Sequence, residues 1–200
     1  MAMDILGLKK HTIAWFQAEL PNNLYYHGLH HTLDVLQAAE MYAKMEQISE
    51  EGMLLVQAGA LLHDAGFTKT YFKNEPVGAE LAGEVLPKFG FSERQIAIVQ
   101  RMIMATALPQ SPQSQLDQIL CDADLDYLGR DDFYAVAHTL KREWADYGLI
   151  KNLREWYEQQ VRFFEMHRFH TASAQNLRNE QKKRYIAEMY ELLGITSPVA

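Results

Sequence analysis

Residues 53–66 read MLLVQAGALLHDAG, an apolar stretch of helical type that ends in a His-Asp pair just before a glycine. Successive helical residues point about 100° apart, so His63 and Asp64 can reach one ion only if it lies near the helix end. Gly66 gives the chain a place to turn there. The segment therefore predicts a polar site at the end of a buried helix.

Apolar residues recur at steps of three and four through most of the chain, and no alternating run rich in Val, Ile and Thr is present. We therefore expect an all-α protein, folded as one helical bundle over residues 1–200. Ser92 and Gln95 have the capping-box spacing, and Pro87 predicts a kink or a helix end near Leu86. The expected helices cover residues 8–20, 28–46, 51–64, 76–89, 92–106, 113–122, 131–146, 152–169 and 171–193.

Composition limits the partners. The 200-residue chain has a formal net charge of −7, which argues against a nucleic acid polymer, because phosphate neutralisation requires clustered Lys and Arg. A small phosphorylated molecule remains compatible if a bound cation offsets its charge. No apolar run is long enough for a membrane span, and the single Cys121 excludes an intramolecular disulfide. We expect a cytoplasmic protein.

Two further polar residues lie on apolar helical faces. His31 heads a stripe that otherwise packs inward, and Asp124 follows Leu120 at helical spacing. By the same periodicity Asp122 and Asp126 fall on a polar face with Gln118. A buried carboxylate needs a metal or a cation, and Arg101 is an alternative partner for Asp124. A lone buried His is more often a core residue bonded to a carbonyl.

Taken together, His31, the His63-Asp64 pair and Asp124 are far more specific than any one of them. They supply mixed nitrogen and oxygen donors, a set that a divalent metal accepts. We expect one such ion, with Fe, Mn, Co, Ni, Zn and Mg as candidates.

The pattern resembles the HD superfamily of metal-dependent phosphohydrolases, and the resemblance covers roughly residues 24–130 of a chain whose helices continue over 131–200. Residues 26–35, YHGLHHTLDV, are similar to the motif YHNxxHAxDV of cyclic-nucleotide phosphodiesterases, and Ala123-Asp124-Leu125 matches a later motif. The resemblance implies that the metal ligands are His31, His63, Asp64 and Asp124. It implies a general-acid role for His27, with Asp64 or Asp124 orienting the water.

Departures from the family pattern bear on the metal and the substrate. Many HD proteins have His-Glu where Asn74-Glu75 stands, and a further His near Ala105-Thr106 when they hold two metals. Their absence favours one tightly held ion, with Glu75 left for a looser ion or a water. No acid follows Asp64 within the next turn, which makes alarmone and 5′-nucleotide substrates less expected.

Several cationic and aromatic side chains are candidates for substrate binding, each with a structural alternative. Lys69 and Tyr71 follow the His-Asp pair in an expected loop, and Arg130 follows Asp124, where it alternatively caps a helix. Arg178 and Lys182 lie one turn apart and can close over an anion, or form surface ion pairs with Glu180 or Glu188. The stripe through Trp156, Gln160 and Phe163 fits a core or a homodimer surface, and His167 and His170 are expected to be structural.

These features predict a metal-dependent phosphohydrolase or phosphodiesterase that acts on a small nucleotide-like phosphate ester through metal-activated water. One alternative is a non-catalytic sensor module that binds a nucleotide in the same pocket. Another is a helical interaction protein whose His and Asp residues are incidental. The presence of a proton donor, His27, favours the enzyme over the sensor.

Overall fold

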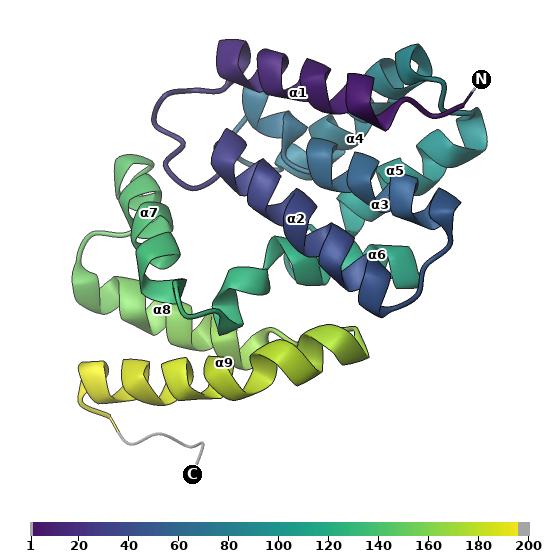
Figure 1. The fold of residues 1–200 in the computed structure, drawn as a ribbon. Coiled ribbons are helices and arrows are strands. Elements are labelled where there is room, and N and C mark those ends of the chain that lie inside the picture. Colours follow the sequence, from purple (N-terminus) through teal and green to yellow (C-terminus); the bar gives the residue numbers. More distant parts are fainter. Residues whose placement is uncertain (1, 196–200) are drawn as a thin grey trace.

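The computed structural model describes residues 2–195, and within them every regular element is helical, which confirms the all-α prediction. Figure 1 shows the α-helices in chain order. Their bounds are α1 Ile5–Glu19, α2 Leu29–Met45, α3 Glu50–Leu62, α4 Asn74–Val85, α5 Glu93–Ala105, α6 Gln115–Asp124, α7 Phe133–Asp146, α8 Leu153–Met166 and α9 Ala172–Leu193. Short 3-10 turns follow three of them: η1 Ala65–Thr68, η2 Leu86–Phe89 and η3 Asp126–Gly129.

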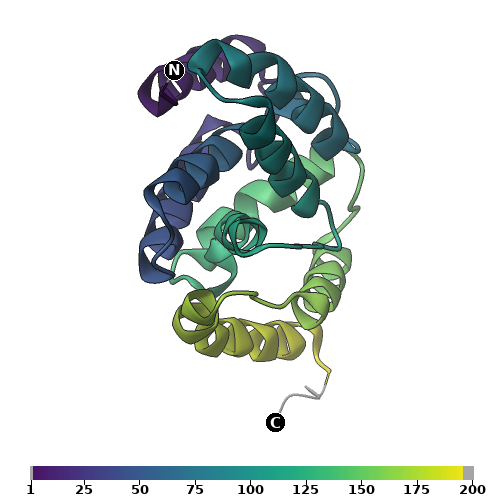
Figure 2. The ribbon, with the colours of Figure 1, turned by 90° about the vertical axis from the view of Figure 1, so that its right-hand side faces the viewer.

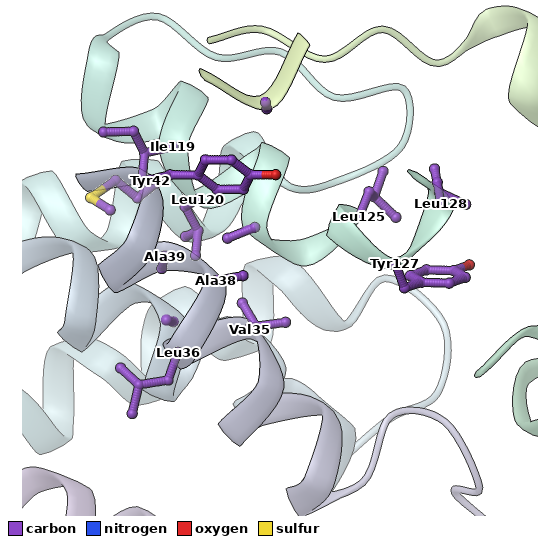
Figure 3. Close-up of a cluster of buried hydrophobic side chains, with 14 of the residues drawn as sticks. Val35, Leu36, Ala38, Ala39, Tyr42, Ile119, Leu120, Leu125, Tyr127 and Leu128 are labelled. Atoms are coloured by element: carbon purple, nitrogen blue, oxygen red, sulfur yellow. The ribbon is translucent and has the colours of Figure 1, made fainter. Parts of the chain in front are cut away.

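Helix α2 forms the centre of the bundle and packs against both α3 and α6. Its inward stripe includes Val35, Ala38 and Tyr42, all buried, and Figure 3 shows these side chains near Ile119 and Leu120 of α6. Because His31 lies one turn before Val35 on the same stripe, packing this stripe also brings its imidazole into the interior.

Local signals set several helix ends as expected. Ser92 and Gln95 form both hydrogen bonds of a capping box at the start of α5. Helix α4 ends at Val85, just before Pro87, and a 3-10 turn continues to Gly90. Gly90 has φ +79°, a left-handed conformation that glycine adopts without steric penalty. These ends fix how the α4–α5 pair lies beside α3.

Gly66 permits a very close packing of η1 on α4. A Cβ atom built at Gly66 would lie 1.9 Å from the backbone oxygen of Asn74. Any side chain at this position would therefore push the start of α4 away from the His-Asp pair. The glycine is needed here for space.

The C-terminal helices are tied to the rest of the bundle by two buried carboxylates. Asp122 accepts hydrogen bonds from the backbone N–H groups of His170 and Thr171, and Asp126 pairs with Arg178 of α9. The expected polar face for Asp122 and Asp126 is therefore wrong: both are buried, because the end of the sequence covers them. Figure 2 shows α9 along the base of the molecule, at the opposite end from α1. The division of the chain near residue 130 stays a prediction.

No described helix combines the length and the apolar character that a bilayer span requires.

Candidate metal centre and adjoining cavity

Three side chains from three helices converge at the end of α3. Nε2 of His31 lies 3.1 Å from Oδ1 of Asp124 and 3.3 Å from Nε2 of His63, and the latter nitrogen lies 3.5 Å from the same Asp124 oxygen. Donor atoms around one transition-metal ion, bound at 2.0–2.2 Å, are about 3–4 Å apart. One ion can therefore contact all three side chains.

Asp64 belongs to the same cluster. Its Oδ2 lies 3.2 Å from Nε2 of His63 and 3.5 Å from Nε2 of His31. This oxygen is buried and has no hydrogen-bond partner among the described residues. A buried carboxylate oxygen without a donor is unfavourable, and a cation would relieve that cost. The donor set thus fits a divalent metal.

His63 is oriented by the backbone of its own helix. Its Nδ1–H donates to the carbonyl oxygen of Ala60 at 2.9 Å, which leaves Nε2 facing Asp64 and Asp124. His63 itself caps α3 at its C-terminal end. A backbone acceptor on one ring nitrogen fixes the tautomer that presents the other nitrogen to a metal.

The electrostatics of the cluster reflect mutual neutralisation. Burial raises the pKa of the Asp124 carboxyl, but hydrogen bonds and charges from His31 and His63 outweigh burial and hold this pKa below its ordinary value. Burial lowers the pKa of His63, but the nearby carboxylates of Asp64 and Asp124 raise it well above the ordinary value. A metal that enters this cluster would displace protons from its ligands.

His27 lies beside the cluster, in the loop that precedes α2. The helix begins at Leu29 with Gly28 as its N-cap, so His27 belongs to the preceding loop. Its ring centroid is nevertheless 5.9 Å from that of His31, and its ring stacks on Phe67 at 4.3 Å. The imidazole is therefore held next to the cluster by packing and by the loop.

Glu143 of α7 is the residue that sequence reasoning missed. Its carboxylate is completely buried and accepts hydrogen bonds from Nδ1 of His27 at 2.5 Å, from the backbone N–H groups of Tyr26 and His27, and from the Tyr71 hydroxyl. Burial by itself lowers the pKa of His27, but the bond to Glu143 and the charges of nearby carboxylates raise it overall. Because Glu143 engages Nδ1, Nε2 is the nitrogen left for a ligand.

A cavity of about 220 Å³ opens against the cluster and His27. Most of its wall is aromatic or aliphatic. The lining residues are Tyr26, His27, Asp64, Phe67, Tyr71, Asn74, Glu75, Thr106, Leu108, Asp124, Leu125, Tyr127, Leu140, Trp144, Gln160 and Phe163. Asn74 Oδ1 and Gln160 Oε1 are buried without hydrogen-bond partners among the described residues.

The structure brings only part of the expected substrate-binding set to this cavity. Tyr71 and Glu75 line it. Lys69 does not, and its Nζ lies 3.6 Å from Glu19 at the surface. Gln160 and Phe163, which the sequence placed on a core or dimer face, also line the cavity: Gln160 is buried, and Phe163 packs against the core.

Arg130, Arg178 and Lys182 also lie away from the cavity lining. Arg130 forms ion pairs with Asp34 and Asp132, and Arg178 pairs with Asp126. Lys182 is 5% exposed and donates to the backbone oxygen of His167, and burial lowers its pKa to about 8. Arg101, the alternative partner of Asp124, binds Asp117 instead.

Comparison with known proteins identifies the class. Residues 28–126 match the HD domain family, so the chain belongs to this family. No curated protein matches the chain. Among solved structures, it is similar to a predicted HD superfamily hydrolase from an uncultured Thermotogales bacterium, with 23% identity, a TM-score of 0.59, and coverage of 95% of this chain and 90% of the other. It is also similar to Bacillus subtilis YpgQ, solved in complex with ADP, with 20% identity, a TM-score of 0.64, and coverage of 94% and 95%.

Proposed function

We propose that the protein is a metal-dependent phosphohydrolase or phosphodiesterase that acts on a small nucleotide-like phosphate ester. The observation that carries the proposal is the position of His27, a proton donor, next to the group of His31, His63 and Asp124, with Asp64 beside it. His27, Asp64 and Asp124 line the same cavity. Family membership supports hydrolysis, and the ADP complex of YpgQ supports a nucleotide-like ligand.

The roles follow from the donor set and the hydrogen bonds. His31, His63, Asp64 and Asp124 would hold one divalent ion. When bound, such an ion supplies Lewis acidity that lowers the pKa of water and polarises a phosphoryl oxygen. Asp64, whose Oδ2 has no protein donor among the described residues, orients the attacking water.

His27 protonates the leaving oxygen. Its Nδ1 is held by Glu143, so Nε2 carries the proton that is transferred to the departing alkoxide. Glu143 is a positioning residue, because it contacts His27 and its backbone rather than the cavity. A buried carboxylate that binds one ring nitrogen of a histidine determines which nitrogen faces the ligand.

A release assay tests the proposal. Purified protein is incubated with Mn²⁺, Ni²⁺, Co²⁺ or Mg²⁺ and a panel of mono-, di- and cyclic nucleotides and bis-aryl phosphates. We expect release of phosphate or nucleotide from at least one ester, lost in Asp64→Ala and kept in Asp131→Ala, an exposed carboxylate outside the cavity. Tight nucleotide binding with no turnover under any metal would instead support the sensor module.

A further inference from the structure

The cavity has few positive charges of its own. Among residues 2–195, no Lys or Arg lines it, and His27 is the one basic side chain that does. Asp64, Glu75 and Asp124 line it as carboxylates, and Glu143 lies directly behind His27. Any anion that enters must therefore be neutralised by His27 and by the ion that the cluster would hold.

Three cations that the sequence offered for substrate binding are paired with other carboxylates outside the cavity lining. Arg130 lies 2.8 Å from Asp34, and Arg178 lies 2.7 Å from Asp126. Lys69 is close to Glu19. Inside the cavity, a second or third phosphate would extend away from the ion toward carboxylates and aromatic rings, because no Lys or Arg is among the lining residues.

The remaining wall is suited to a flat, uncharged group. Leu140 and Trp144 of α7 and Phe163 of α8 line it, together with Phe67 of the HD domain and Tyr127, which follows the matched residues. Apart from His27 and the carboxylates, the polar lining groups are neutral. They include Thr106 and the amides of Asn74 and Gln160. At about 220 Å³, the space is also below the roughly 300–1,000 Å³ of many ligand pockets.

We propose, on the basis of the phosphohydrolase function above, that the site selects esters with a single phosphate joined to a flat, uncharged group, and discriminates against nucleoside di- and triphosphates. The phosphate is placed at the His-Asp cluster and His27. The flat group lies against the wall that α7 and α8 supply, outside the residues that match the HD domain. This selectivity would separate the chain from YpgQ, whose structure holds ADP.

Binding of adenosine nucleotide analogues that differ in phosphate number tests the discrimination against di- and triphosphates. Calorimetric titrations of Mn²⁺-loaded protein, at matched free Mn²⁺, compare adenosine 5′-monothiophosphate with α,β-methylene-ADP and α,β-methylene-ATP. We expect affinity to fall about tenfold or more with the first added phosphate. An equal or higher affinity for the methylene diphosphate, or no measurable binding of the monothiophosphate, would overturn the proposal.

A second comparison tests the flat group. Phenylphosphonate should bind at least tenfold more tightly than methylphosphonate, and Trp144→Ala should remove most of this difference. Trp15→Ala, a tryptophan of α1 outside the cavity, is the matched control and should preserve it. Equal affinities for the two phosphonates in the unmodified protein would contradict this part of the proposal.

A gain of charge provides the sharpest test. Leu108 lines the cavity but is 61% exposed, so lysine can replace it without disturbing the core. Leu108→Lys should raise the affinity for α,β-methylene-ADP relative to the monothiophosphate by threefold or more, whereas Leu6→Lys on the exposed face of α1 should not. An unchanged ratio in Leu108→Lys would refute the electrostatic basis.

These affinities do not depend on turnover. If no ester is cleaved in the release assay, the proposed hydrolysis is contradicted. The order of the affinities for one, two and three phosphates separately tests the discrimination against di- and triphosphates.

Discussion

Oε1 of Glu143 lies 2.5 Å from Nδ1 of His27, although 116 residues separate the two in the sequence. Glu143 is fully buried, and it receives three further hydrogen bonds from Tyr71 and from the backbone of Tyr26 and His27. A buried carboxylate is stable only when it is paired in this way. The arrangement fixes both the orientation of His27 and the sign of its pKa shift.

Glu143→Gln should therefore change the pH profile of turnover. The amide removes a negative charge beside His27, so the pKa of His27 falls from its raised value. A general acid works only when protonated, and activity is lost as pH rises through its pKa. We expect the alkaline limb of kcat to move to lower pH. A kcat that falls equally at all pH values, with an unmoved limb, would show that Glu143 is only structural.

His27→Ala should separate substrates by their leaving groups. An ester with a poor leaving group needs its oxygen protonated, whereas an activated aryl phosphate does not. We expect kcat to fall about 10²–10⁴-fold on the poor ester and by much less on the activated one, measured as steady-state rates. Equal losses on both esters would remove His27 from the acid role.

His31 and His30 form a natural pair for testing the metal centre. His31 is buried with Nε2 facing Asp124, whereas the neighbouring His30 lies outside the cluster. His31→Ala should lower the metal content of the purified protein, measured by elemental analysis, from near one ion per chain to a small fraction. His30→Ala should keep it. Equal metal contents in both variants would contradict the proposed ligand set.

Much of the site followed from periodicity in the sequence. The apolar stripe of α2 placed His31 inward, and the apolar run before the His-Asp pair placed His63 at a buried helix end. The spacing from Leu120 singled out Asp124 as the acid that faces the core, but Asp124 is only partly buried, and Asp122 and Asp126 are buried more deeply. The same argument holds for Glu143, which lies three residues after Leu140 on the buried face of α7. A carboxylate on an apolar stripe was therefore a usable signal for this residue too.

The failures have a common physical cause. Asp122 and Asp126 lie on a face that is polar by periodicity, but residues near 170 and 178 cover it in the folded chain. Arg130 and Arg178 were equally plausible as phosphate ligands and as structural partners. Only tertiary packing, which pairs segments more than 50 residues apart, decides which carboxylates these cations meet.

Arg178→Met tests the structural role of that cation. Its guanidinium makes two hydrogen bonds to Asp126, a carboxylate that is 3% exposed and that also accepts the Tyr42 hydroxyl. Without Arg178, the buried Asp126 keeps only Arg130 as a cation, 3.6 Å away, so we expect stability in urea unfolding to fall by at most about 3 kcal/mol. Arg184→Met, an exposed arginine of the same helix, is the control. Unchanged stability together with a tenfold higher KM would return Arg178 to substrate binding.

His167 should make the protein sensitive to acid. It is 7% exposed, both ring nitrogens lack hydrogen-bond partners among the described residues, and burial together with the charge of Lys182 lowers its pKa to about 3. In the unfolded chain His167 is protonated near pH 6.5, whereas in the folded chain it is protonated only near pH 3. The free energy of unfolding is therefore highest above pH 6.5 and decreases as the pH falls toward 3. Between pH 7 and 4.5, urea unfolding should show about 2–3 kcal/mol more loss in the unmodified protein than in His167→Phe, whose ring can still stack on Phe163. The other acidic and basic groups are common to both proteins and cancel in the comparison. An equal loss of unfolding free energy in both proteins would mean that protonation of His167 does not destabilise the fold.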